Sequence, residues 1–129
     1  MTDTNPGAEL RAAARALRAA AAAAVEASGA GTWRARRQFP SQPDADFTDL
    51  WATGGQPLLR GGGKGRPPAY VHAPVGDYIA LVDPTVGAVL ADWLEAEATR
   101  LTSVAHPAWN DHLAPQGFAV ARKINGSVQ

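Results

Sequence analysis

The chain has 129 residues, so it fits one small domain, and its twelve basic and twelve acidic side chains cancel. With no net charge, nothing global draws it to nucleic acid or membrane surfaces. It has no cysteine, which excludes disulfides, thiolate nucleophiles and thiolate metal sites. The N-terminus lacks the pattern of a secretory signal, and the alanine stretch after it is too charged to span a bilayer, so we expect a cytoplasmic protein with no membrane partner.

Alanine dominates the N-terminus, with thirteen copies in the first thirty residues, and it is the strongest helix former. Asn5 can cap a helix, Pro6 suits its first turn and Ser28-Gly29 can end it, which predicts a helix over 6–28. We expect an alanine-rich helix at 1–28 and a small α+β domain at 29–129. The larger apolar side chains, Leu10, Leu17 and Val25, share roughly one face. A basic stripe on the same helix consists of Arg11, Arg15 and Arg18.

Short strands and turns are predicted between residues 32 and 71. TWRARRQF alternates, with Trp33, Ala35, Arg37 and Phe39 on one side and Thr32, Arg34, Arg36 and Gln38 on the other. FTDLWA, residues 47–52, predicts a second strand, and Tyr70 with Val71 a brief one. The sequence therefore predicts an α+β fold: a small antiparallel sheet of two to four short strands packed against C-terminal helices.

Three helices are predicted in the C-terminal half. Asp83-Pro84 can cap and start the clearest of them. Its expected apolar face comprises Val86, Val89, Leu90, Trp93, Leu94 and Leu101, and Trp93 is expected in the core. A shorter helix at 75–82 is expected to turn Tyr78, Ile79 and Val82 inward. The last helix should begin at Pro115, run to about Asn125 and stop at Gly126, with an apolar row of Phe118, Ala121 and Ile124.

The stretch RGGGKGRPP, residues 60–68, looks like a phosphate-binding loop but matches no known nucleotide motif. A Walker loop needs a hydroxyl after its lysine, whereas Gly65 follows Lys64. A dinucleotide fingerprint needs a third glycine where Arg66 stands, and Pro67-Pro68 forbids a helix start. Two interpretations stay open: a flexible connection, or an anion contact made by glycine amides with Arg60, Lys64 and Arg66.

Other candidate chemistry is sparse. His106, Asp111 and His112 lie close together in the sequence. No further residues are placed to support them as metal ligands, so no metal is expected. Trp33, beside Arg34 and Arg36, could stack on a planar ligand or pack under the first helix. The candidate ligand-binding residues are Trp33, Arg34, Arg36, Arg60, Lys64 and Arg66, and no catalytic residue or cofactor is predicted.

Two segments, YIALVDPTVGAVLADWLEAEATRL at 78–101 and FAVARKINGS at 118–127, resemble small proteins of actinobacterial phages and of Streptomyces-type prophages. The shared pattern is Y-I-A, two residues, (D/H)-P, A-D-W-L and a closing A-V-A-R-x-I-N. The resemblance covers roughly the C-terminal 55 residues convincingly. The resemblance implies a phage or prophage setting in a bacterial host cytoplasm. Because the shared residues are packing and capping residues, it assigns no activity.

Two functions follow as hypotheses. The first is a non-catalytic phage accessory protein that binds or sequesters an anionic, nucleotide-like host ligand or signal and so interferes with host defence. The alternative is a protein–protein interaction module whose alanine-rich helix pairs with a copy of itself or with a host or virion protein. The zero net charge and the lack of a reading helix argue against sequence-specific DNA binding. No residue pattern points to an enzyme.

Overall fold

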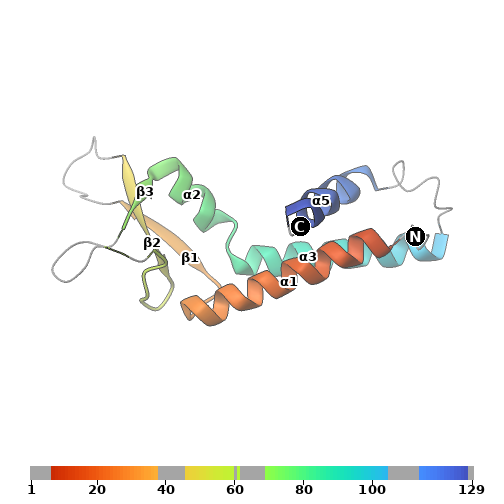
Figure 1. Cartoon of the computed structure of the whole chain (residues 1–129), viewed down its shortest axis with the longest axis horizontal. Helices are drawn as coiled ribbons and strands as arrows, with labels where there is room; N and C mark the ends of the chain where they lie inside the picture. The colour runs from red at the N-terminus through yellow and green to blue at the C-terminus, as the bar shows by residue number, and fades with distance from the viewer. Residues whose placement is uncertain (1–6, 38–45, 60, 62–68, 105–113, 128–129) are drawn as a thin grey trace. The chain divides into compact units, whose positions relative to one another are not determined.

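A computed structural model describes residues 7–37, 46–59, 61, 69–104 and 114–127 (Figure 1). It confirms the α+β fold, with an N-terminal helix, a three-stranded antiparallel sheet and C-terminal helices. In chain order the elements are α1 (Ala8–Ser28), β1 (Trp33–Arg37), β2 (Phe47–Ala52), β3 (Val71–His72), α2 (Ala73–Leu81), α3 (Pro84–Val104) and α5 (Pro115–Ser127). Two compact units divide the chain, Met1–Ala20 with Gly87–Gln129 and Ala21–Val86, and the boundary predicted after residue 28 stays a prediction.

The first unit is built from helices that meet through small side chains. Alanine makes up more than half of the buried core cluster, so the helix backbones can approach closely. Phe118 is the largest side chain of this core, and the expected apolar row of the last helix is confirmed. The buried residues of the core cluster are Leu10, Ala13, Ala14, Ala91, Leu94, Ala98, Leu101, Ala114, Phe118 and Ala121.

The predicted core face of α3 is partly wrong. Trp93 is 38 % exposed instead of buried, and Val86 and Val89 are exposed as well. The buried row consists of Ala91, Leu94, Ala98 and Leu101, which repeats at helical spacing but lies to one side of the bulky residues. The edge of the Trp93 ring still lies near Gly117 of α5.

Three ion pairs, made by two arginines, link the described helices of this unit across its surface. Arg18 of the predicted basic stripe pairs with Glu95 and, at 2.8 Å, with Asp92 of α3. Arg122 Nε lies 3.1 Å from Glu9 Oε1. The last helix includes Gly126 and continues to Ser127, so the predicted stop at Gly126 is wrong.

The second unit contains the sheet, in the order β1-β2-β3. The predicted strand at 47–52 is confirmed without change, and β1 pairs with it so that Arg34 faces Trp51 and Arg36 faces Asp49. The third strand is Val71–His72, one residue later than expected, and it pairs with Phe47 and Thr48. Gly54 and Gly55 have positive φ angles and form the turn after β2.

The edge of β2 opposite β1 is occupied by two separate segments. After the turn, Ala52 N donates to Gln56 O and Leu58 N donates to Leu50 O, both at 2.8 Å. Farther along the same edge, Val71 pairs with Thr48. The glycine-rich stretch therefore connects two segments of one sheet edge, which is a different role from the strand-to-helix turn of a nucleotide-binding loop.

Alternation along β2 gives the sheet two distinct faces. Thr48, Leu50 and Ala52 are buried on the face where α2 packs. The approach is close at Gly76, because a Cβ there would overlap Thr48 Oγ1. On the outer side of α2, Tyr78 is 66 % exposed and Val82 is exposed too, so the expectation that both turn inward is wrong. The α2 helix buries only the small residues Ala73 and Gly76 instead.

The predicted end of α1 and the predicted start of α3 are confirmed, whereas α2 covers Ala73–Leu81 instead of the expected 75–82. At the end of α1, Gly29 has a φ of 88° and its N–H donates to Val25 O at 2.8 Å. At the start of α3, Asp83 Oδ1 accepts from Val86 N at 3.2 Å and from the backbone and hydroxyl of Thr85. The predicted start of α1, with Asn5 and Pro6, lies outside the described residues.

Candidate functional site

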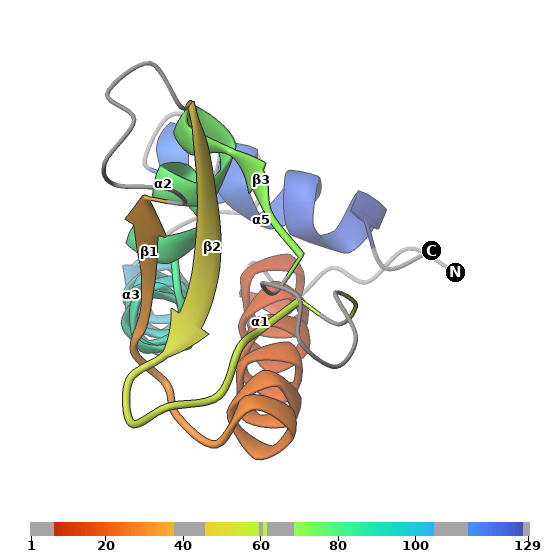
Figure 2. The same ribbon diagram turned by 90° about the vertical axis from the view of Figure 1, so that its left-hand side faces the viewer.

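The candidate site is the face of the sheet that α2 does not cover. Figure 2 looks onto the sheet, with α2 behind it. On this face, alternate residues of β1 contribute cations and alternate residues of β2 contribute aromatic rings. Further rings lie at β3, including that of Tyr70. We call this surface the aromatic face, and its residues are Arg34, Arg36, Phe47, Asp49, Trp51, Tyr70 and His72.

Arg36 and Trp51 form the centre of the aromatic face. The guanidinium carbon of Arg36 lies 4.4 Å from the ring centroid of Trp51, which is a stacked cation–π contact. Arg36 Nη2 also lies 3.5 Å from Asp49 Oδ2. The Arg36 side chain nevertheless stays 53 % exposed, so it can contact a further planar group.

Arg34 adds a second cation to the same face. It is exposed, and its Cα partner in β2 is Trp51. Among the described residues, no carboxylate forms an ion pair with Arg34, in contrast to Arg36. A guanidinium offers several N–H donors, which can bind an anionic group.

A second aromatic group lies at the other end of β2. The Phe47 ring contacts the edge of Tyr70, with centroids 5.1 Å apart, and His72, with centroids 4.9 Å apart. Tyr70 and His72 are exposed, whereas Phe47 is half-buried between them and the strand. Aromatic rings held in this way present flat, rigid surfaces for stacking.

Two buried polar atoms of the aromatic face have no hydrogen-bond partner in the described part of the chain: Asp49 Oδ1, an acceptor, and Trp51 Nε1, a donor. Asp49 is only 6 % exposed. A buried polar group without a partner costs about 1–3 kcal/mol, so such pairs of atoms are typical of places where a ligand or water completes the bonding.

Trp33 lies on the opposite face and has a structural role. Its Nε1 donates to Ser28 Oγ at 3.2 Å and to Ala30 O at 3.1 Å, and its backbone N–H donates to Asp83 Oδ2. Trp33 therefore contacts the end of the first helix directly, as expected if its role is to pack there.

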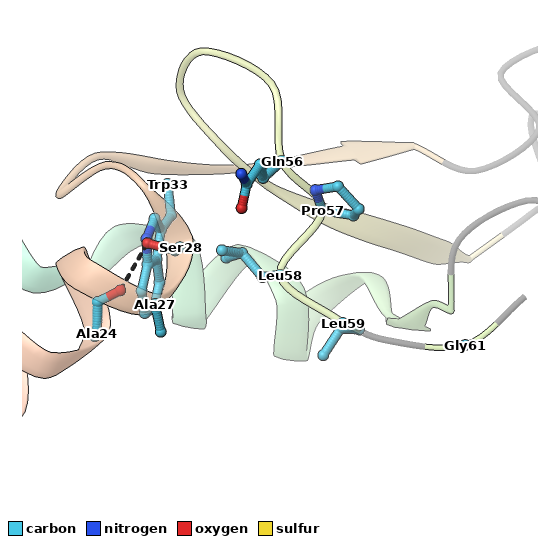
Figure 3. Close-up of a pocket in the computed structure, with 9 residues that line it drawn as sticks. All are labelled: Ala24, Ala27, Ser28, Trp33, Gln56, Pro57, Leu58, Leu59 and Gly61. Carbon is cyan, nitrogen blue, oxygen red and sulfur yellow. Dashed lines mark hydrogen bonds between the residues drawn. The ribbon is translucent and has the colours of Figure 1, made fainter.

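A pocket of about 540 Å³ opens beside Trp33 (Figure 3). In the close-up the indole stands next to Ser28, whose hydroxyl donates to Ala24 O at 2.7 Å, while Gln56 and Leu58 extend from the opposite wall. The described lining residues carry no charge: Ala24, Ala27, Ser28, Trp33, Gln56, Pro57, Leu58, Leu59 and Gly61. This lining suits an apolar guest better than an anion.

The structure thus brings some of the predicted site residues together and separates others. Arg34 and Arg36 share the aromatic face, whereas Trp33 points to the other side of β1. Arg60, Lys64 and Arg66 lie outside the described residues. Sequence reasoning missed Trp51 and Phe47, although the alternation of FTDLWA does place both on one side of their strand.

No group of three or more His, Asp or Glu side chains that could hold a metal ion occurs in the described part of the chain, and His106, Asp111 and His112 lie outside it. Among the described helices, none has the length and hydropathy needed to cross a membrane. No protein-family model matches the chain, and searches of curated proteins and of solved structures also found no match.

Proposed function

We propose that the protein is a non-catalytic accessory protein that binds an anionic, nucleotide-like ligand on the aromatic face. The observation that carries the proposal is the stacking of Arg36 on Trp51, with Arg34, which forms no ion pair with a described residue, on the same face. A planar ring can stack on the outer side of the Arg36 guanidinium, and a phosphate can accept from Arg34. The resemblance to small phage proteins supports a role in sequestering a host signal and interfering with host defence.

Isothermal titration with a panel of linear and cyclic nucleotides tests the proposal. We expect binding tighter than millimolar that is lost in the double variant Arg34→Ala/Arg36→Ala. Arg15→Ala is the matched control, because Arg15 is also an exposed arginine but lies on α1. If no nucleotide binds, or if the double variant binds like the unmodified chain, the proposal fails.

A second titration separates the sheet from the glycine-rich stretch. Lys64→Ala/Arg66→Ala removes two of the cations that the sequence alone assigns to ligand binding. A loss of affinity in this variant means that the stretch adds to the site, and unchanged affinity assigns binding to the sheet. If only this variant loses binding, the aromatic face is not the site.

Self-association is a second candidate function, favoured by apolar side chains on the outer surface of the second unit. Tyr78 and Leu81 of α2 are 66 % and 72 % exposed, and Val75 and Val82 are exposed beside them. On the alanine-rich helix α1, Ala22, Ala23 and Ala27 are exposed as well. Light scattering at increasing concentration tests this function: a mass that doubles and reverts to monomer in Tyr78→Ser/Leu81→Ser supports it, and a constant monomer excludes it.

A further inference from the structure

We infer that the aromatic face binds single-stranded nucleic acid, with bases stacked on its rings and phosphates held by Arg34 and Arg36. This inference rests on the proposed function and extends it from one nucleotide-like ligand to a strand.

The spacing of the aromatic groups calls for more than one base. Phe47 and Trp51 are four residues apart on β2, and a strand rises about 3.3 Å per residue, so their Cα atoms lie roughly 13 Å apart. One end of the face offers Tyr70 against Phe47, and the other offers Arg36 against Trp51. Two separate stacking positions suit two bases joined by a backbone, whereas a single ring system occupies one of them.

The cations lie where a backbone would run. Arg34 and Arg36 are both on β1, directly beside β2 and its aromatic side chains. A strand laid along β2 therefore places its bases on the rings and its phosphates near the two arginines. Proteins that bind single strands on a sheet surface use aromatic rings and a local concentration of positive charge. They need neither a recognition helix nor a positive net charge.

The unpartnered polar atoms favour a nucleobase over a simple anion. Asp49 Oδ1 needs a donor and Trp51 Nε1 needs an acceptor, and both atoms are buried on this face. Phosphate oxygens are acceptors only, whereas the edges of adenine, guanine and cytosine carry both donors and acceptors. In a duplex these edges are paired and the rings are stacked inside, so the form that fits is an unpaired strand.

Fluorescence anisotropy with a labelled single strand of mixed sequence, about twelve nucleotides long and made as DNA and as RNA, tests the inference. The full chain is titrated in parallel with adenosine monophosphate, a dinucleotide and the matching duplex. We expect the single strand and the dinucleotide, which both offer two joined bases, to bind more tightly than the monophosphate and the duplex. The logarithm of the affinity should fall with the logarithm of salt concentration at a slope of about −1.4, because two phosphates each contribute about −0.7.

Two exposed side chains provide matched variants. Tyr70→Ala removes one stacking surface and should weaken strand binding roughly 5- to 150-fold, whereas Tyr78→Ala removes the other tyrosine of the chain, on α2, and should have no effect. Arg34→Ala should reduce the magnitude of the salt slope by about 0.7, and Arg15→Ala should leave it unchanged. Circular dichroism shows whether each variant keeps its fold.

The outcomes separate the strand inference from the proposed function. If the monophosphate binds as tightly as the strand, the inference is overturned and the proposed function stands. If nothing in the panel binds, both fail. Equal affinity for duplex, or equal loss in Tyr70→Ala and Tyr78→Ala, overturns stacking on the aromatic face.

Discussion

The guanidinium of Arg36 lies on the indole of Trp51, 4.4 Å from the ring centroid, although the register of the strands places Arg34 and not Arg36 opposite Trp51. The contact is therefore a diagonal one, made possible by the length of the arginine side chain. It holds Arg36 over the ring, while Arg34 forms no ion pair with a described residue. In the proposed function, Arg36 is therefore the cation for stacking and Arg34 the cation for a phosphate.

A double-mutant cycle measures this contact. The variants Arg36→Ala, Trp51→Leu and their combination should give a coupling free energy of about 0.5–1 kcal/mol, the usual range for an exposed cation–π pair. The cycle with Arg34→Ala is the control, because Arg34 is the Cα partner of Trp51 but no ring contact between them is found. Equal coupling in the two cycles, from urea unfolding curves, would contradict the diagonal geometry.

Local signals predicted much of the fold. The caps depend on a few consecutive residues: Asp83 binds the N–H groups that directly follow it, and Gly29 ends α1 with its positive φ. The strand at 47–52 follows from the alternation of its own side chains. Such features need no knowledge of distant parts of the chain, so sequence patterns locate them well.

The aromatic face could not be assembled in the same way. Alternation places Phe47, Asp49 and Trp51 together, but only the register between β1 and β2 decides that Arg34 and Arg36 share their side. For Trp33 the sequence leaves two interpretations open, stacking on a ligand beside the arginines or packing under the first helix. Adjacent residues of a strand point to opposite faces, and the partner of Arg36 came from the neighbouring strand.

Alanine concealed the core of the first unit. On α3, periodicity of the large residues favoured Val89 and Trp93, which are exposed, while Ala91 and Ala98 are buried beside Leu94. A hydrophobic pattern gives alanine little weight, yet alanine allows the closest approach between helices. The result is a core that depends on few large side chains.

The exchange of buried and exposed positions on α3 has a direct consequence for stability. Leu94→Ala should lower the free energy of unfolding by about 2–5 kcal/mol, because it removes one of the few large side chains of the core. Val89→Ala should change it by less than about 0.5 kcal/mol, since Val89 is exposed. Both follow from urea unfolding monitored by circular dichroism. A larger loss at Val89 than at Leu94 would restore the face predicted from the large residues.

Asp83 should make the stability depend on acid pH. Burial raises the pKa of Asp83, but hydrogen bonds from the Thr85 hydroxyl and from three backbone N–H groups outweigh it and lower the pKa below its ordinary value. Since the unfolded chain has a pKa of about 3.9 for this group, the ionised carboxylate stabilises the fold above that pH, and the contribution is lost as pH falls through the lower folded-state pKa.

The variant Asp83→Asn tests this linkage. It keeps a capping oxygen for Val86 but replaces the second acceptor, which holds the backbone N–H of Trp33. We expect a loss of about 1–2 kcal/mol at neutral pH. The difference from the unmodified chain should shrink as pH falls below about 4, and a difference that stays constant down to acid pH would show that the charge of Asp83 contributes nothing.

Gly76 fixes the distance between α2 and the sheet, because a Cβ at this position would overlap Thr48 Oγ1 and lie 3.2 Å from Val71 Cγ2. Gly76→Ala should therefore push α2 away from β2 and cost about 1–3 kcal/mol. Gly126→Ala is the matched control, since Gly126 also lies in a helix but has open space around it, and alanine there should be neutral or stabilise by up to about 1 kcal/mol.

Because β2 also carries Trp51 and Asp49, the displaced helix should weaken ligand binding on the aromatic face in Gly76→Ala and leave it intact in Gly126→Ala. Equal stability and equal binding in the two variants would mean that the close approach of α2 does not position the sheet.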